Sequence, residues 1–283
     1  MTYAKLSGAL LARKDEPAAP SLPEVGAVAS IAPAPLGGEG ARRLAHHLKA
    51  LRLPMFLREY DRLAEQCAAE GLDHARFLLR LTELEMAERQ QRQVDRYIRE
   101  ARFPAVKGLD GFDFAALPSL DQARVLDLAR CEYVDRGENI IAIGNSGTGK
   151  THVAIGLGLA ACRNRQSVCF TTAASLVREL LETHDQKRLL RLQDRLVAYK
   201  LLIIDELGYV PLSTHGTELL FEVISRRYER GSTIVTSNLP FEEWTSVFGS
   251  PRLAGAVHDR LTHHAHILNM HGDNYRQRAP LVP

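Results

Sequence analysis

Residues 144–151 read Gly144-Asn145-Ser146-Gly147-Thr148-Gly149-Lys150-Thr151, which fits the pattern GxxxxGK(S/T) of a phosphate-binding loop. The loop follows an apolar segment at 139–143 and precedes a helix-like stretch at 152–161, which is the setting that the pattern requires. Backbone N–H groups of such a loop wrap a phosphate, and the positive end of the helix dipole adds to the attraction. We expect Lys150 to reach the β and γ oxygens of a nucleotide and Thr151 to hold Mg²⁺ through its hydroxyl.

Short apolar segments alternate with helical stretches from this loop onward. The segments are residues 140–144, 168–171, 201–205, 233–237 and 265–268. Strands that are separated by crossover helices form a parallel sheet covered on both faces. The sequence therefore predicts an α/β fold of three layers with a central parallel sheet, in a domain that spans residues 103–283.

Two of the expected strands end in polar side chains, Asp205-Glu206 and Asn238. In an open α/β sheet this edge carries the active-site groups. We expect Asp205 to bind Mg²⁺ through water, Glu206 to polarise the attacking water, and Asn238 to orient that water or to contact the γ-phosphate. The Glu206 carboxylate favours a hydrolase over a small-molecule kinase. The alternatives are a strand that stops at two solvated acids and an asparagine that belongs to a turn.

The chain before residue 103 has a different composition. Residues 1–40 form a leader rich in Ala and Pro, which has little to bury, and we predict it to be disordered. Residues 41–102 predict a small all-helical N-terminal domain, with Pro54 where a new helix could begin. Its last helix carries an apolar stripe at helical spacing, which indicates packing surface and consists of Phe77, Leu81, Leu84, Val94 and Ile98. Residues 103–114 suit a domain connection.

Bulk composition excludes some classes of protein. The formal charge is only +2, so the overall balance neither demands nor excludes a polyanionic partner. The four cysteines are scattered without a CxxC pair, and no apolar run is long enough to cross a bilayer. We expect reduced thiols, a cytoplasmic location and no membrane partner.

Taken together, six segments resemble an AAA+ ATPase of the IstB-like branch, whose members are transposition helper ATPases related to the DnaC helicase loader. The resemblance runs from about residue 41 to 278. It rests on LKALRLPMFLREY (48–60), VKGLDGFDF (106–114), GNSGTGKTHVAIGLG (144–158), LLIIDELGYVPL (201–212), TIVTSNLPFEEW (233–244) and DRLTHHAHIL (259–268).

The resemblance implies ATP and Mg²⁺ as ligands and gives roles to single residues. Residues 144–151 would be the Walker A loop, Asp205 and Glu206 the Walker B pair, and Asn238 the sensor. Arg260 looks like the arginine that reaches into the ATP site of a neighbouring subunit, an effect worth about a thousandfold or more in related enzymes. Arg252 is a rival for that role, and an ion pair of Arg260 with Asp259 or a nearby acid is the structural alternative.

Two features depart from the family pattern. The resemblance supplies no role for the leader before Ala41. The sequence also ends soon after Arg278, so we expect no C-terminal lid domain and no second sensor arginine from such a lid.

Charge and histidine spacing bear on other ligands. The helical segment at 41–107 is rich in arginine and lysine, which suits a phosphate backbone but is also typical of a solvated helix face. Without a base-reading motif, DNA binding is expected to be largely independent of sequence. The histidines near the C-terminus fit no common zinc spacing, so we predict that they are hydrogen-bonded or exposed; they are His258, His263, His264, His266 and His271.

The leading hypothesis is therefore an ATPase that assembles as a homo-oligomer on double-stranded DNA and presents the DNA to a cognate transposase. The alternative within the class is a DnaC-like replicative helicase loader, in which the helical domain would grip a helicase. Two hypotheses from outside this class are a metabolic P-loop kinase and a DNA-bridging protein that uses ATP structurally.

Overall fold

The computed structural model describes residues 38–183 and 185–275. They divide into two compact units, of which the first ends at Leu81 and the second begins at Thr82. The leader predicted to be disordered lies outside the described residues as far as residue 37. Within the described ranges, no helix is both long and apolar enough to span a bilayer.

The first unit is helical. It contains α1 (Gly38–Ala50), α2 (Pro54–Ala69) and the beginning of α3 (His74–Glu100). Pro54 occupies the first turn of α2, as predicted, because its missing N–H group has no partner to lose there. Gly71 takes a left-handed φ of 66° after α2, which allows the chain to turn into α3. The core of this unit is formed by Leu48, Met55, Leu63, Cys67 and Leu81.

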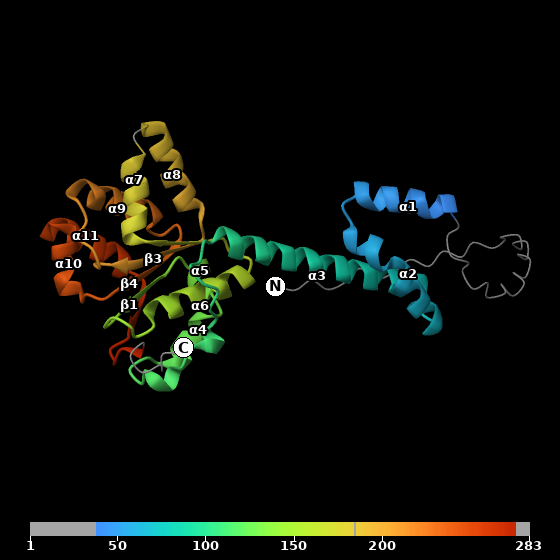
Figure 1. Cartoon of the computed structure of the whole chain (residues 1–283), viewed down its shortest axis with the longest axis horizontal. Coiled ribbons are helices and arrows are strands. Elements are labelled where there is room, and N and C mark those ends of the chain that lie inside the picture. The colour runs from blue at the N-terminus through green and yellow to red at the C-terminus, as the bar shows by residue number, and fades with distance from the viewer. Residues whose placement is uncertain (1–37, 184, 276–283) are drawn as a thin grey trace, which may run out of the picture. The chain divides into compact units, whose positions relative to one another are not determined.

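The second unit is built on a parallel sheet of five strands (Figure 1). The strands are β1 (Asn139–Ile143), β2 (Val168–Thr172), β3 (Leu201–Leu207), β4 (Ser232–Ser237) and β5 (Ala265–Asn269). Their order is β2-β3-β4-β1-β5, and each neighbouring pair is parallel. The predicted α/β fold is confirmed, and each strand begins and ends within two residues of its predicted limits.

Helices cover both faces of this sheet. They are α4 (Gln122–Leu128), α5 (Glu132–Asp135), α6 (Lys150–Arg163), α7 (Ala173–Glu182), α8 (Gln186–Ala198), α9 (Thr214–Arg227), α10 (Trp244–Phe248) and α11 (Pro251–Thr262). Three short 3₁₀ turns lie at Leu109–Gly111, Phe114–Ala116 and Phe241–Glu243.

The alternation of side chains along β1 separates two hydrophobic cores. Ile140 and Ala142 face a core shared with α6, whereas Ile141 and Ile143 face a core shared with α7, α9 and α11. Every residue of β1 is buried. A strand that is apolar on both faces is what a sheet between two helical layers requires, so the phosphate loop that follows β1 starts from a rigid central position.

The division at Leu81 and Thr82 falls inside α3, whereas the sequence places the end of the helical domain at Arg102. From Tyr97 onward the chain packs on the sheet: Tyr97, Ile98 and Phe103 are partly buried against the first core, and the backbone N–H of Phe170 donates to the carbonyl of Ala101 at 2.8 Å. The limits of the functional domains, 41–102 and 103–283, stay a prediction.

Candidate functional site

The phosphate loop connects β1 to α6 in a conformation that needs its glycines. Gly147 and Gly149 have left-handed φ values of 82° and 91°, and Gly149 is the residue just before α6. A Cβ atom at Gly149 would lie 2.6 Å from the Phe112 ring, and one at Gly144 would lie 2.0 Å from the carbonyl oxygen of Met270. The loop is therefore closely packed against Phe112 and Met270, and a larger residue at either glycine would collide with them.

Lys150 and Thr148 close the loop on itself. The ammonium group of Lys150 donates to the carbonyl oxygens of Gly144 and Asn145, at 2.7 Å each. The hydroxyl of Thr148 donates to the carbonyl oxygen of Asn145 at 2.9 Å. These bonds hold a positive charge at the mouth of the loop, where a phosphate oxygen would be drawn to it.

Asp205 joins the loop to the neighbouring strands. Its carboxylate is only 3% exposed and accepts hydrogen bonds from the hydroxyl of Thr151, at 3.0 Å to each oxygen, and from the hydroxyl of Thr236. A carboxylate and a hydroxyl in contact are hard oxygen ligands of the kind that Mg²⁺ prefers. The residues present therefore fit a magnesium ion that bridges the loop and β3.

Glu206 differs from Asp205 in exposure and in backbone conformation. Its side chain is exposed, its φ is 61°, and the pairing of β3 with β4 shifts register between Ile204 and Leu207. The hydroxyl of Thr236 accepts a hydrogen bond from the Glu206 N–H at 3.0 Å while it donates to Asp205. One hydroxyl thus bonds the buried carboxylate of Asp205 and the backbone of Glu206, whose own carboxylate is open to solvent. It also holds Glu206 in a left-handed conformation that costs roughly 1–2 kcal/mol outside glycine.

Asn238 directly follows β4. Its side-chain oxygen is buried and has no hydrogen-bond partner among the described residues. A buried amide oxygen without a hydrogen-bond partner lowers the stability of the fold by about 1–3 kcal/mol. A hydrogen bond from a ligand or a water would remove that loss. The position, at the same edge of the sheet as the phosphate loop and Glu206, fits a polar group that would contact a bound nucleotide.

The structure adds contacts that the sequence did not single out. Thr236 is one, because a threonine within a strand looks like an ordinary β residue. Phe112 is another: its ring lies 5.3 Å from the His152 ring, and the Nε2 atom of His152 lies 2.9 Å from the Gly108 carbonyl. The segment after β5 also reaches the loop, since the N–H of Tyr275 donates to the Gly147 carbonyl at 3.1 Å. The family resemblance of the segment at 106–114, which contains Phe112, is the sequence signal that pointed to this region.

Arg260 lies away from this group. The backbone carbonyls of Arg260 and Leu261 accept from the side chain of Asn139, at 3.5 and 3.1 Å, and Asn139 is the first residue of β1. The length of β1, about 16 Å, separates that point from the phosphate loop. The Arg260 guanidinium lies 4.7 Å over the Phe221 ring and donates to the Ala256 carbonyl at 3.1 Å, so the suggested ion pair with Asp259 does not form. Arg252 is exposed in the first turn of α11, about 12 Å along the helix from Arg260.

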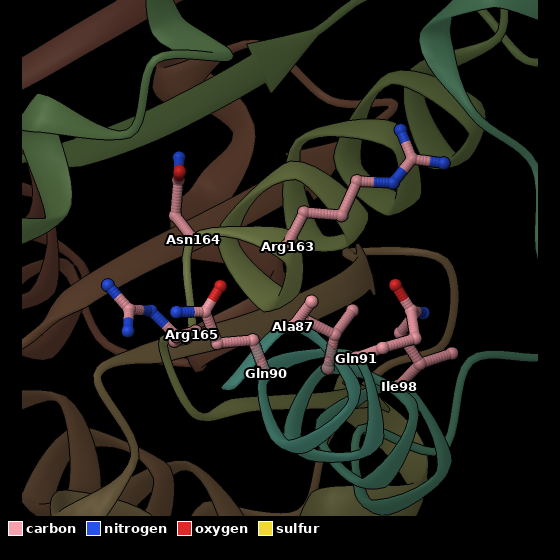
Figure 2. Close-up of a pocket in the computed structure, with 8 residues that line it drawn as sticks. Ala87, Gln90, Gln91, Ile98, Arg163, Asn164 and Arg165 are labelled. Atoms are coloured by element: carbon pink, nitrogen blue, oxygen red, sulfur yellow. The ribbon is translucent and has the colours of Figure 1, made fainter. Parts of the chain in front are cut away.

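A separate cleft of about 650 Å³ opens between α3 and the turn that follows α6. Figure 2 shows the lining side chains of both segments, Gln90 and Gln91 from α3 and Arg163, Asn164 and Arg165 from the end of α6 and the turn after it. Within the described part of the chain, the side chains of Arg163 and Arg165 make no hydrogen bond or ion pair. Among the residues that the structure describes, no acidic side chain lines the cleft, and the cleft is distinct from the phosphate loop.

Comparisons with known proteins agree with these features. A family model described as IstB-like ATP binding protein matches residues 46–281. The insertion sequence IS5376 putative ATP-binding protein of Geobacillus stearothermophilus is 38% identical over 236 residues, which is 83% of this chain and 94% of that protein. The insertion sequence IS21 putative ATP-binding protein of Pseudomonas aeruginosa is 39% identical over 235 residues, 82% of this chain and 89% of that protein.

Among solved structures, the replication initiator DnaA bound to AMPPCP and single-stranded DNA aligns with a TM-score of 0.50 at 18% identity. The alignment covers 61% of this chain and 52% of that one. At this identity the likeness concerns the fold alone.

Proposed function

The chain belongs to the IstB-like ATP-binding protein family, and from this premise and the geometry of the site we propose that it is a Mg²⁺-dependent ATPase. It would assemble as a homo-oligomer on double-stranded DNA and assist a transposase in DNA transposition. The observation that carries the hydrolytic part is the single Thr236 hydroxyl that positions a buried Asp205 and an exposed Glu206 beside the phosphate loop. The link to transposition rests on relatives whose names place them in insertion sequences.

Each residue of the loop edge has one part in the proposed reaction. Lys150 would pass its ammonium group from the loop carbonyls to the β and γ phosphate oxygens. Thr151 and Asp205 would hold Mg²⁺, which neutralises charge on the phosphates when bound. Glu206 would accept a proton from the attacking water, and the unpartnered amide oxygen of Asn238 would orient that water.

Arg260 is proposed to act on a second copy of the chain. It lies at the opposite edge of the sheet from its own phosphate loop, farther away than an arginine side chain extends. Stacking on Phe221 holds the guanidinium without an acidic partner among the described residues, so its charge is available to a neighbour. Hydrolysis would then depend on assembly.

We expect Arg260→Ala to lower ATP turnover by about a thousandfold and to leave nucleotide affinity close to wild type. Steady-state phosphate release and fluorescent-nucleotide binding measure the two effects. Mixing Arg260→Ala with Lys150→Ala protein tests whether Arg260 acts on a neighbouring subunit. The Lys150 variant supplies Arg260 and the Arg260 variant supplies an intact phosphate loop, so turnover should partly return. Arg252→Ala is the matched control. Loss of turnover in the Arg252 variant alone would transfer the role to Arg252.

DNA binding is supported by two arginines whose side chains have no partner among the described residues, and by an arginine-rich helical segment. Arg163 and Arg165 border an acid-free cleft in the second unit (Figure 2), and the helical segment at 41–102 is rich in arginine. Contacts to phosphates give affinity that is independent of sequence and falls with salt. We expect the helical domain to contact the DNA, the transposase or both.

The test is fluorescence anisotropy of a labelled random-sequence duplex titrated with the protein. We expect salt-sensitive binding that requires ATP and Mg²⁺, and weaker binding by the Arg163→Glu, Arg165→Glu double variant. Arg130→Ala, which removes an arginine paired with Asp127 at 3.8 Å, is the control. Absence of binding by the wild type under all conditions would argue for a helicase loader or a kinase, which co-purification with a helicase and acceptor-dependent turnover would separate.

A further inference from the structure

Two turns at the amino-terminal edge of the sheet bring three exposed ligand-type side chains together. Glu229 lies in the turn between α9 and β4, and His263 and His264 form the turn between α11 and β5. One ligand atom from each residue lies within 4.8 Å of the others. The two imidazole rings are 4.2 Å apart between their centroids, at an angle of 65°.

The backbone that carries these side chains is fixed by Asn139. Its side-chain oxygen accepts from the N–H of Thr233 in β4 at 2.9 Å, and its amide nitrogen donates to the Leu261 carbonyl at the end of α11 at 3.1 Å. Its own backbone N–H donates to the carbonyl of His264 at 2.7 Å. Asn139 is 8% exposed, so one buried residue sets the spacing between both turns before any ligand arrives.

Tyr228 gives one of the histidines an orientation. Its hydroxyl lies 2.8 Å from the Nδ1 atom of His263, and the two rings are 5.8 Å apart. When Nδ1–H donates to the Tyr228 oxygen, the lone pair of Nε2 is left for another partner. An outer hydrogen bond of this kind is typical of histidines that bind metal.

The donor set selects the class of ion. Two imidazole nitrogens and one carboxylate suit Zn²⁺, Co²⁺ and Ni²⁺ rather than Mg²⁺ or Ca²⁺, which take oxygen ligands. Two ligands on one ion at about 2.1 Å stand at most about 4.2 Å apart. The three side chains are within 4.8 Å and exposed, so a small rotation of each closes the set without moving the backbone.

We propose that Glu229, His263 and His264 form a binding site for a divalent transition-metal ion, with Zn²⁺ as the expected occupant and Tyr228 as its orienting residue. The site is separate from the magnesium ligands Thr151 and Asp205, which lie at the other edge of the sheet. A bound ion ties the end of α9 to the end of α11, the helix that carries Arg260. It thereby fixes the position of that arginine relative to the sheet.

The test is calorimetric titration of untagged full-length protein with Zn²⁺, in excess Mg²⁺ so that oxygen sites are occupied. We expect one strongly bound Zn²⁺ per chain, and affinity at least tenfold lower in His263→Ala and in Glu229→Gln. Tyr228→Phe should weaken binding by about 10- to 100-fold, which simple surface chelation would not show. Co²⁺ should give a visible spectrum without thiolate charge transfer, because the four cysteines are buried elsewhere.

The matched control is His215→Ala. His215 pairs with Glu218 at 3.4 Å on an exposed helix face and therefore offers a histidine and a carboxylate without the second histidine. Its loss should leave the titration unchanged. Three results would each overturn the site. They are stoichiometric Zn²⁺ binding that persists in His263→Ala, a thiolate band with Co²⁺, and wild-type Zn²⁺ binding no tighter than that of an exposed pair such as His215 and Glu218.

Discussion

Glu206→Gln is expected to lower the rate of ATP hydrolysis by about 100- to 10,000-fold while ATP still binds. The glutamine keeps the size of the side chain and the backbone bond to Thr236, so the left-handed turn at residue 206 is retained. What it loses is the carboxylate that would accept a proton from water. Single-turnover phosphate release measures the loss, and a fluorescent ATP analogue measures binding.

Glu218→Gln, at an exposed glutamate of α9, controls for the removal of one surface charge. On DNA, the Glu206 variant should remain assembled with ATP for longer than wild type, because the step that resets the complex is blocked. Wild-type turnover by the Glu206 variant would assign the base to another group and would remove the main argument for a hydrolase.

Lys150→Ala is expected to weaken ATP binding by roughly 10- to 100-fold, which is the range for a lost hydrogen bond to a charged group. The reason is that Lys150 holds the positive charge of the phosphate loop, through its bonds to the carbonyls of Gly144 and Asn145. Equilibrium binding of labelled ATP measures the change. Loading onto duplex DNA in the presence of ATP should fall with it.

Lys187→Ala, at an exposed lysine of α8, is the control for charge. Thermal unfolding separates the loss of a ligand contact from a loosened loop, since Lys150 also bonds the Gly144 and Asn145 carbonyls. Equal DNA loading by the Lys150 variant, the Glu206 variant and wild type would show that ATP does not control assembly.

The sheet and the phosphate loop could be predicted from the sequence because their signals are local. Apolar runs such as residues 201–204 and the glycine spacing of 144–149 depend on neighbours in the chain, and the strands confirm them. The roles of Lys150, Thr151, Asp205, Glu206, Asn238 and Arg260 stay predictions that the geometry makes specific.

Contacts made across the fold could not be predicted in the same way. Thr236 reads as one more β-branched strand residue, and only the register of β3 against β4 puts its hydroxyl between Asp205 and Glu206. The histidines have no zinc spacing in sequence, because the third ligand, Glu229, comes from a turn that precedes a different strand. The short-range periodicity of apolar residues along the chain does not show which turns lie at the same edge of the sheet.

The placement of the phosphate loop and Arg260 at opposite edges of one sheet limits the symmetry of any assembly that uses both. Such a contact joins two different surfaces, so copies stack head to tail, as a closed ring or as an open helix. In an open helix the terminal copy has no neighbour to supply an arginine, and the assembly contains one fewer complete site than it has subunits. Addition of a copy at that end would then complete the ATP site of the subunit that had been terminal. ATP would be hydrolysed at the interior sites earlier than at the end of the assembly.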